Sequence, residues 1–445
     1  MRGATVRARR LDAQAHGLAR EHVSSNAVDV TTKLQDAGFA GLLVGGCVRD
    51  LLLGLTPKDF DVATDATPEQ VKELFRRSRL VGRRFRIAHV RYGRELIEVS
   101  TFRRAVADKA DERHHSDAGM ILRDNVYGTL EEDAFRRDFT INALYYDPQS
   151  EEVIDFVGGL QDLKDRCIRF IGDTSTRIRE DPVRVLRAIR FQAKLEFDPE
   201  PAIADCFEEA AELMAAIPPA RLFDEIQKLL LSGQAAQGWR LLAGTPLRQA
   251  LFPGCNPEEP LIDRAMRNTD ERIRVGKPVT PGFLLAVLLW RDYLNRIGEF
   301  EGQLKPSEAR VHAASDCLAV QQQIIAVPRR FSQFIREVWQ LQDRLEHRLA
   351  RSIERLAGHV RFRAAYDFLV LRAETEQDAT AVELAEAAEW WTRYQEVGAE
   401  KQSAMIEERR TSQPRKKRRR RRGRRRPTDV DSSSAEINLA DSESP

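Results

Sequence analysis

The segment 41–61 combines a glycine turn, an arginine and a pair of aspartates, which together could hold a triphosphate and its metal ions. An apolar run ends at Gly45 and Gly46, and a helical segment begins directly after them. Such a turn can direct backbone N–H groups at an anion beside a helix N-terminus. Arg49 adds a planar, fork-shaped donor that suits phosphate oxygens. The pattern predicts a phosphate-binding turn.

The two aspartates follow about a dozen residues later, in the run Asp-Phe-Asp-Val-Ala. In a strand, a period of two puts Asp59 and Asp61 on one face and Phe60 on the other. Paired carboxylates at this spacing suit hard divalent cations such as magnesium. Alone, a glycine pair after a strand is usually only a turn, and an Asp-x-Asp is more often an exposed strand face. The order and spacing of the two together favour a site.

Further polar residues could belong to the same site. Residues 84–92 and 95–102 alternate around Gly93, which is typical of a β-hairpin. Glu98 is then either an ordinary exposed strand residue or a third carboxylate near the metals. Arg137 and Asp138 place a cation beside an anion; Asp138 could position a ribose hydroxyl, join the metal-site carboxylates, or simply cap a helix.

A second dense cluster of charges lies in residues 180–191. On a helix, Glu180, Arg184 and Arg187 form one stripe, and Arg190 lies beside it. Three cations with an acid can bind phosphates and offer donors and acceptors to a base edge. Asp181 precedes a proline and is also a good helix N-cap, and the arginines could be surface ion-pair partners. The spacing does not identify the base.

Length and composition set the broad class. With 445 residues the chain has room for two or three domains. The longest strongly apolar stretch, residues 283–290, is far shorter than the roughly 20 residues that span a bilayer. No secretory signal peptide is visible, although the arginine-rich start leaves an organellar transit peptide open. The five cysteines are widely spaced without a C-x-x-C pair, which predicts a reducing, cytoplasmic compartment and argues against structural zinc.

The net charge of +2 conceals an uneven distribution. Residues 415–426 carry eleven positive charges, and the segment beyond them carries five acids. Removing both leaves a net charge of −4 for residues 1–414. A run of like charges cannot form a core, so we expect a flexible arm that binds polyphosphates rather than a solubility or localisation tail. Nucleic-acid affinity must then come from local patches and from this arm.

Three motifs in order resemble the family of tRNA CCA-adding enzymes and bacterial poly(A) polymerases. They are Gly45-Gly46-Cys47-Val48-Arg49-Asp50 with Asp59-x-Asp61, Arg136-Arg137-Asp138-Phe139-Thr140-Ile141-Asn142-Ala143, and Glu180-Asp181-Pro182-Val183-Arg184-Val185-Leu186-Arg187-Ala188-Ile189-Arg190-Phe191. Segments at 57–64, 79–90, 217–223 and 362–369, with the arginine-rich run, resemble the poly(A) polymerase branch in particular. Cys47 stands where the family commonly has glycine or alanine, which leaves the chemistry intact.

The resemblance implies an α+β fold, in which a polymerase-β-like nucleotidyltransferase head with a mixed sheet precedes helical neck, body and tail regions. The expected division is a disordered leader at 1–24, the head at 25–172, a nucleotide- and RNA-binding neck at 173–235, a helical body and tail at 236–400, and a disordered tail at 401–445.

The resemblance also assigns roles, residue by residue. Catalysis is assigned to Asp59, Asp61 and Asp138, with magnesium at Asp59 and Asp61 in a two-metal mechanism. Nucleotide binding is assigned to Gly45, Gly46, Arg49, Arg137, Asp181, Arg184, Arg187 and Arg190. The implied activity is template-independent transfer of AMP from ATP to RNA 3′ ends, with release of pyrophosphate, in RNA processing and decay.

Two alternatives stay open at this point. The catalytic motifs are shared with CCA-adding tRNA nucleotidyltransferases, and the motifs do not show how ATP is chosen over CTP. An RNA-binding adaptor that has lost activity is a second alternative, although a protein that only binds RNA has no need of paired aspartates. The expected partners are RNA 3′ ends, through basic patches and the arginine-rich run, and the RNA-decay machinery.

Overall fold

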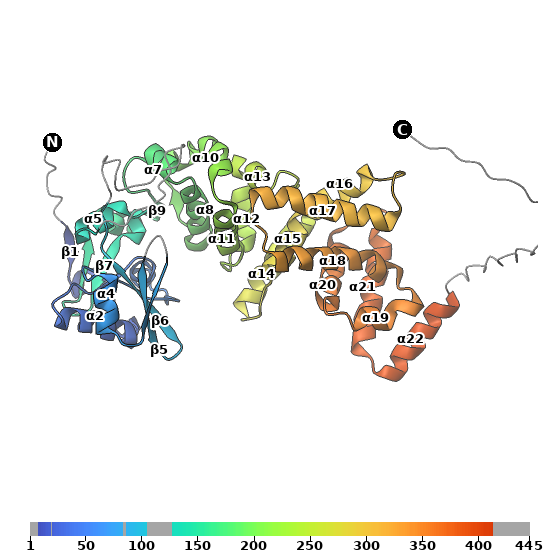
Figure 1. Ribbon diagram of the computed structural model, residues 1–445, viewed down its shortest axis with the longest axis horizontal. Helices are drawn as coiled ribbons and strands as arrows, with labels where there is room; N and C mark the ends of the chain where they lie inside the picture. The colour runs from blue at the N-terminus through green and yellow to red at the C-terminus, as the bar shows by residue number, and fades with distance from the viewer. Residues whose placement is uncertain (1–7, 19, 83–85, 105–126, 413–445) are drawn as a thin grey trace, which may run out of the picture.

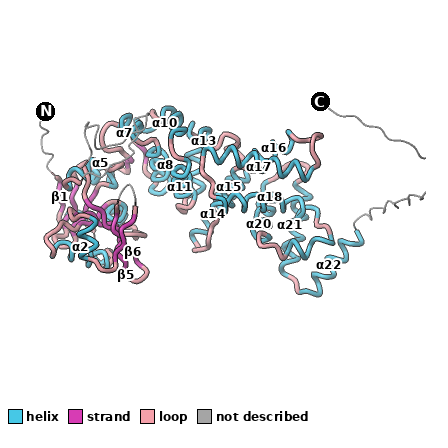
Figure 2. Tube along the Cα trace, in the orientation of Figure 1, coloured by secondary structure: helices cyan, strands magenta, loops and turns pink. Residues whose placement is uncertain are grey.

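The computed structural model describes residues 8–18, 20–82, 86–104 and 127–412. The described chain is elongated, with a mixed α/β part at the N-terminal end and helices from there to the C-terminal end (Figure 1). Strands are concentrated in the N-terminal part (Figure 2). The predicted α+β class, with a mixed sheet followed by helical regions, is confirmed.

One eight-stranded sheet forms the scaffold of the N-terminal part. Its strands run in the order β1 (Arg9–Leu11), β8 (Glu152–Asp155), β7 (Leu144–Asp147), β2 (Leu42–Val44), β3 (Asp61–Thr64), β6 (Glu95–Thr101), β5 (Ile87–Tyr92) and β4 (Ser78–Val81). The helices of this part are α1 (Ala13–His16), α2 (Ser25–Asp36), α3 (Gly46–Leu52), α4 (Pro68–Leu74), α5 (Leu130–Arg136) and α6 (Gly159–Lys164).

The centre of the sheet brings the predicted site strands together. β2 pairs antiparallel with β3, and β3 pairs parallel with β6, so that Asp61 lies opposite Glu98. The hairpin of β5 and β6 forms as predicted and puts His89 opposite Glu98. A capping box formed by Thr67 and Gln70 starts α4. Residues that lie opposite each other on neighbouring strands point to the same face of the sheet. The register of the strands therefore determines which polar side chains can come into contact.

The rest of the described chain is almost entirely helical. Only a short parallel pair, β9 (Cys167–Ile168) with β10 (Asp198–Pro199), interrupts the helices. The α-helices of this part are α7 (Thr174–Glu180), α8 (Val183–Leu195), α9 (Pro201–Ala204), α10 (Phe207–Leu213), α11 (Pro219–Leu230), α12 (Ala235–Ala243), α13 (Pro246–Leu251), α14 (Pro260–Arg274), α15 (Pro281–Leu288), α16 (Trp290–Glu299), α17 (Pro306–Ile324), α18 (Arg329–His347), α19 (Ile353–Ala357), α20 (Phe362–Thr375), α21 (Ala381–Glu396) and α22 (Ala399–Ser412).

Helix α8 connects the sheet to these helices. Its apolar side is buried, with Val185, Leu186 and Ile189 at most 2% exposed. Phe191 makes an edge contact with Phe139, which in turn stacks on Phe170 at 4.9 Å. The hydrophobic core therefore continues from the sheet through α8 into the middle helices, while a separate core around Trp391 holds the last ones. This continuity fixes the charged side of α8 relative to the sheet.

The structure differs from the sequence-based expectation at both ends. Residues 1–24 were expected to be disordered, but β1 pairs antiparallel with β8 and α1 is capped by Asp12. The sheet edge supplies hydrogen bonds that composition does not reveal. At the other end, α22 continues to Ser412, beyond the expected boundary at 400, and the remaining residues of that segment lie outside the described ranges.

Candidate active site

The predicted phosphate turn joins β2 to α3 and lies against two guanidinium groups. Gly45 adopts a φ of 81°, which favours glycine. A Cβ placed on Gly45 would lie 3.7 Å from Arg137 Nη1, and one on Gly46 would lie 3.6 Å from Arg49 Nη2. The guanidinium groups of Arg137 and Arg49 therefore both lie beside the turn. The arrangement is suited to a polyanion.

Arg49 is held in place by its neighbours rather than left mobile. It is only 3% exposed; its Nε and Nη2 donate to Asp50 Oδ1, and its Nη1 donates to Asn142 Oδ1 at 2.6 Å. The guanidinium also lies over the Phe191 ring of α8, at 5.1 Å. Lys194 Nζ, also from α8, donates to Asp50 Oδ2 at 3.2 Å. Three of the five N–H donors of Arg49 are used in this way, and two remain.

Arg137, at the end of α5, is anchored from the opposite side of the turn. Its Nε and Nη2 donate to Asp133 Oδ2, and its Nε also reaches the Tyr145 hydroxyl at 3.1 Å. Burial lowers the pKa of Arg137, but Tyr145 and Asp133 raise it above its ordinary value overall. The guanidinium is therefore permanently charged, and its Nη1 is the nitrogen that faces Gly45.

The carboxylates lie beside this cation. Asp61 begins β3; Asp59 lies two residues earlier, in the segment leading into the strand, and Phe60 between them is buried. The prediction that both aspartates lie in the strand is therefore wrong for Asp59, because the ladder with neighbouring strands begins only at Asp61. Burial, together with repulsion from Glu98 and Asp59, raises the pKa of Asp61 to about 6 overall, although Arg137 acts to lower it. Glu98 and Asp59 therefore both lie close enough to Asp61 to repel its charge.

Glu98 is the residue whose role the sequence left open. It is the register partner of Asp61, and its Oε1 lies 3.4 Å from His89 Nε2. Within the described ranges, no three acid, histidine or cysteine side chains form a ready-made metal cage. The donor set nevertheless suits magnesium, which keeps several waters and takes one or two carboxylates together with substrate phosphates.

Asp138 lies in a different environment from the other two predicted catalytic aspartates. Its Oδ2 pairs with Arg187 Nη2 of α8 at 2.6 Å, and its Oδ1 accepts the Phe139 N–H. Burial would raise the pKa of Asp138, but Arg187 and the Phe139 amide lower it below its ordinary value overall. The charges that act on Asp61 are those of Glu98, Arg137 and Asp59, and Asp138 is not one of them. Asp138 therefore connects the sheet to the helical neck.

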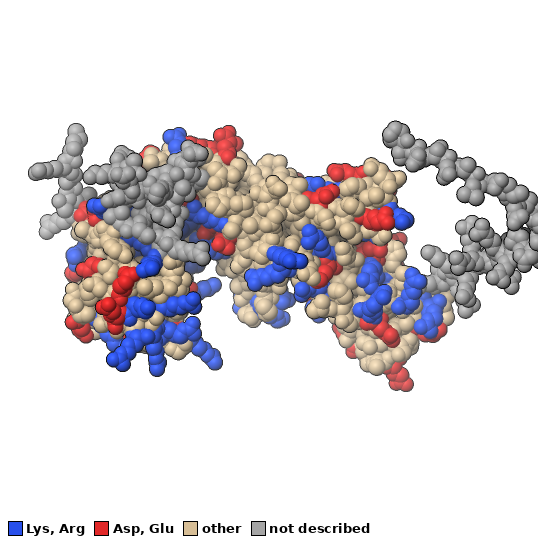
Figure 3. All heavy atoms as spheres, viewed as in Figure 1, with Lys and Arg blue, Asp and Glu red and all other residues tan. Residues whose placement is uncertain are grey.

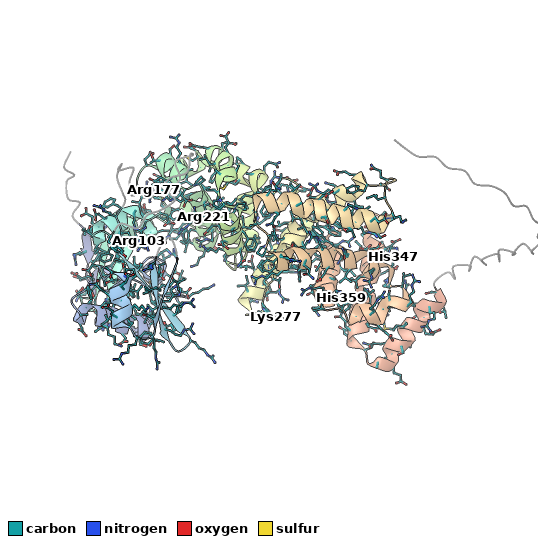
Figure 4. The ribbon with its side chains drawn as sticks, in the orientation of Figure 1. Arg103, Arg177, Arg221, Lys277, His347 and His359 are labelled. Carbon is teal, nitrogen blue, oxygen red and sulfur yellow. The ribbon has the colours of Figure 1, made fainter. Side chains whose placement is uncertain are left out.

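The remaining predicted nucleotide-binding residues form a chain of ion pairs. Arg184 bridges to Glu180 at 3.1 Å, Asp181 to Arg221 of α11 at 2.5 Å, and Arg190 to Glu225 at 3.8 Å. Asp181 ends α7 rather than capping α8 through its side chain. Arg177 and Arg221, labelled in Figure 4, lie in the neck.

Several positioning residues were not predicted from the sequence. Arg177 donates to the backbone carbonyl groups of Arg136 and Arg137, which ties α7 to the end of α5. Asn142 and Phe191 lie within the sequence motifs that carry the family resemblance. Their place in those motifs was the signal that could have identified them as positioning residues. Nothing in the local pattern singled out Asp133, Tyr145 or Arg221, because their partners are fixed only by the tertiary structure.

Comparisons with known proteins decide the family. The chain is 45% identical to poly(A) polymerase I of Escherichia coli O6:H1 over 409 residues, which covers 89% of this chain and 87% of that protein. The chain belongs to the bacterial poly(A) polymerase family. The corresponding protein of Haemophilus influenzae is 44% identical over 87% of the chain. This enzyme is therefore a nucleotidyltransferase of the poly(A) polymerase type.

Family models match three parts of the enzyme. They are described as the poly A polymerase head domain (residues 42–169), a probable RNA and SrmB-binding site of polymerase A (196–258) and the polymerase A arginine-rich C-terminus (302–426). No helix in the described ranges is long and apolar enough to cross a membrane.

CCA-adding enzymes are more distant relatives. The enzyme of Lactobacillus helveticus is 37% identical over 223 residues, half of this chain. Among solved structures, an apo form of a CCA-adding enzyme aligns with a TM-score of 0.61 at 21% identity, over 88% of each chain. The Thermotoga maritima CCA-adding enzyme with tRNA aligns with a TM-score of 0.52 at 21% identity, over 90% of this chain and 85% of that one. These structural matches establish the fold.

Proposed function

We propose that the enzyme transfers AMP from ATP to the 3′-hydroxyl of RNA, without a template, and releases pyrophosphate. The proposal depends on one observation, which is that a group of cations lies beside a group of carboxylates. The Gly45-Gly46 turn with Arg49 and Arg137 lies directly beside the carboxylates of Asp61 and Glu98. A triphosphate and divalent cations are the ligands that such a paired set of cations and carboxylates can bind together.

In this proposal the triphosphate lies against the glycine turn. Arg49 and Arg137 neutralise its charge, and both are fixed beforehand by Asp50, Asn142 and Asp133, so little reorganisation is needed. Asp59 and Asp61 would hold magnesium, which supplies charge neutralisation and a lower pKa for the RNA 3′-hydroxyl. The 3′-oxygen then bonds to the α-phosphorus as the bond to pyrophosphate breaks. Positioning and electrostatics carry the reaction.

The charged side of α8 supports a role in holding the nucleotide. Asp181, Arg184, Arg187 and Arg190 carry donors and acceptors close to the sheet, each restrained by an ion pair. Restrained groups recognise a planar base better than mobile ones, because less side-chain entropy is lost on binding. We propose that this surface positions the nucleoside, with Asp138 linking it to the catalytic strand region.

Nucleotide incorporation tests the proposal directly. The full chain is incubated with magnesium, an unstructured RNA and each nucleoside triphosphate alone. Long adenylate tracts formed from ATP alone support the proposal. Absence of magnesium-dependent incorporation from any triphosphate would contradict it and would revive the RNA-binding adaptor.

The CCA-adding alternative is tested with a second substrate. A tRNA that ends before CCA is offered CTP alone and ATP alone. Efficient CTP addition to that tRNA, without adenylate tracts on other RNA, would favour the alternative. The higher identity and coverage of the poly(A) polymerase relatives support the first proposal.

Location and partners are proposed on separate grounds. All five cysteines are free thiols, and free thiols fit a reducing compartment such as the cytoplasm. The match of residues 196–258 to a probable RNA and SrmB-binding site supports RNA as a partner. We propose a protein of the RNA-decay machinery as a second partner.

A further inference from the structure

A row of arginines without acidic partners lies at the beginning of α18. Arg329, Arg330 and Arg336 have no carboxylate within ion-pairing distance in the part of the chain that the structure describes. Arg329 and Arg330 are exposed, and Arg330 lies over the Phe331 ring at 4.7 Å. Most arginines of the neck are ion-paired, so this row is a local excess of positive charge in a part of the chain (1–414) with net charge −4.

The row lines two adjoining hollows between the neck and the middle helices. One, of about 510 Å³, is bounded by α11 and the start of α18, and the other, of about 300 Å³, by α17 and α18. Both are lined by Gln322, Val327 and Arg329, and together they are called the groove; Asp224 of α11 also lines the first hollow. Arg329, Ser332 and Arg336 are spaced i, i+3, i+7 on one face of the helix, which makes a polar stripe about 10 Å long.

Helix α11 connects the groove with the proposed nucleotide-binding surface. Ala220 and Phe223 of α11 line the first hollow, and Arg221 of the same helix forms the ion pair with Asp181. Helix α11 also lies within residues 196–258, which match the family model of a probable RNA-binding site. The groove and the proposed nucleotide-binding surface therefore share one helix.

We propose that this groove binds the phosphates of the RNA strand just upstream of its 3′ end, through Arg329, Arg330 and Arg336. The proposal rests on the proposed function. Single-stranded RNA fits the groove because a row of arginines tracks a sugar-phosphate backbone without reading its sequence. Such binding suits an enzyme whose acceptor changes with every added nucleotide. The charge excess argues against an apolar peptide as the occupant.

A matched pair of triple variants tests the proposal. In the first, Arg329, Arg330 and Arg336 are replaced by alanine. In the control, Arg267, Arg274 and Arg363 are replaced, which removes the same charge; each is exposed and is paired with an acid, namely Asp263, Glu271 and Asp367. A double variant, R329E/R330E, confined to exposed side chains, serves as a second test should the first triple variant prove unstable.

The first measurement is binding of a fluorescent oligoadenylate RNA to the full chain at several salt concentrations, without ATP. We expect the groove variant to bind about tenfold more weakly and its salt slope to fall by about 2, since each phosphate contact to a single strand contributes about 0.7. The control should bind within about twofold of the wild-type chain. Equal weakening of both variants, or no weakening of the groove variant, would overturn the proposal.

The second measurement separates binding from chemistry. The groove variant should raise KM for RNA and leave KM for ATP and kcat near their wild-type values. A loss confined to kcat, with RNA binding unchanged, would overturn the groove as an RNA site. If the wild-type chain incorporates no nucleotide, the proposed function fails, but the binding comparison still decides whether the groove holds RNA.

Discussion

The site at the sheet and the charged surface of the neck handle their charges in opposite ways. Around Asp61, three carboxylates lie close together, and burial and repulsion raise the Asp61 pKa to about 6. In the neck, Asp138, Glu180 and Asp181 each have an arginine partner. Figure 3 shows the neck as a continuous part of the molecular surface between the head and the distal helices. In the first region Asp61 is repelled by Glu98 and Asp59, whereas each of these acids in the second region is paired with an arginine.

This difference indicates that the two regions have different functions. A cluster of like charges stores unfavourable energy that cation binding would release, which is typical of a functional site. A fully paired cluster instead holds side chains in place for recognition, at little electrostatic cost. Substitutions in each region test whether the two regions differ in this way.

Removing Asp61 should have the largest effect on activity. Asp61→Ala is expected to reduce AMP incorporation by about a thousandfold, because the metal charge stabilisation it would anchor is worth several kcal/mol. The measurement is the incorporation rate under saturating ATP and RNA. Asp36→Ala, at an exposed helix position, is the control and should keep the wild-type rate. A wild-type rate for Asp61→Ala would remove Asp61 from the catalytic site.

Breaking the Asp138–Arg187 pair should affect both stability and nucleotide binding. Asp138→Asn leaves Arg187 without its partner, at a cost of about 1–3 kcal/mol after allowing for the partial exposure of Arg187. We expect a lower denaturation midpoint and a KM for ATP raised about tenfold.

The double variant Asp138→Asn/Arg187→Met distinguishes positioning from catalysis. If Asp138 acts only by holding α8, the double variant should recover stability and much of kcat. A double variant that is stable but has lost kcat as severely as Asp61→Ala would instead place Asp138 among the catalytic carboxylates, as the sequence motif predicts.

The strain at Asp61 should appear as a pH-dependent stability. Because its folded pKa of about 6 lies above the ordinary value of 3.8, the folded state binds the proton more tightly, and stability falls as pH rises between about 4 and 6. Asp61→Asn should therefore match the wild-type chain near pH 4 and exceed it by about 1–3 kcal/mol above pH 7. Denaturant titrations without magnesium measure the difference. A difference that is independent of pH would contradict the contrast with the neck.

Deleting residues 415–445 should have the smallest effect on the site itself. The deletion removes eleven positive charges, so RNA affinity and its salt dependence should fall while KM for ATP stays unchanged. RNA binding at two salt concentrations and ATP kinetics with saturating RNA are the measurements. An unchanged salt slope would assign the run to solubility or localisation.

The local sequence pattern was sufficient to predict features that depend on residues close together along the chain. The Gly45-Gly46 turn, the pairing of Asp59 with Asp61, the capping box at Thr67 and the β5–β6 hairpin all depend on short-range geometry. The family followed from three such motifs in order. The ordered N-terminal strand could not be predicted in this way, because β1 is stabilised by hydrogen bonds to a strand more than 140 residues away.

The sequence by itself determined which residue types could bind a triphosphate and divalent cations, because turns and strand alternation are encoded over a few residues. Only the tertiary structure decided how they are grouped. Register placed Glu98 beside Asp61, packing of α8 placed Arg187 beside Asp138, and the junction of α11 with α18 formed the arginine groove. Charge repulsion and ion pairing act through space, so distant segments must pack before their electrostatic environment exists.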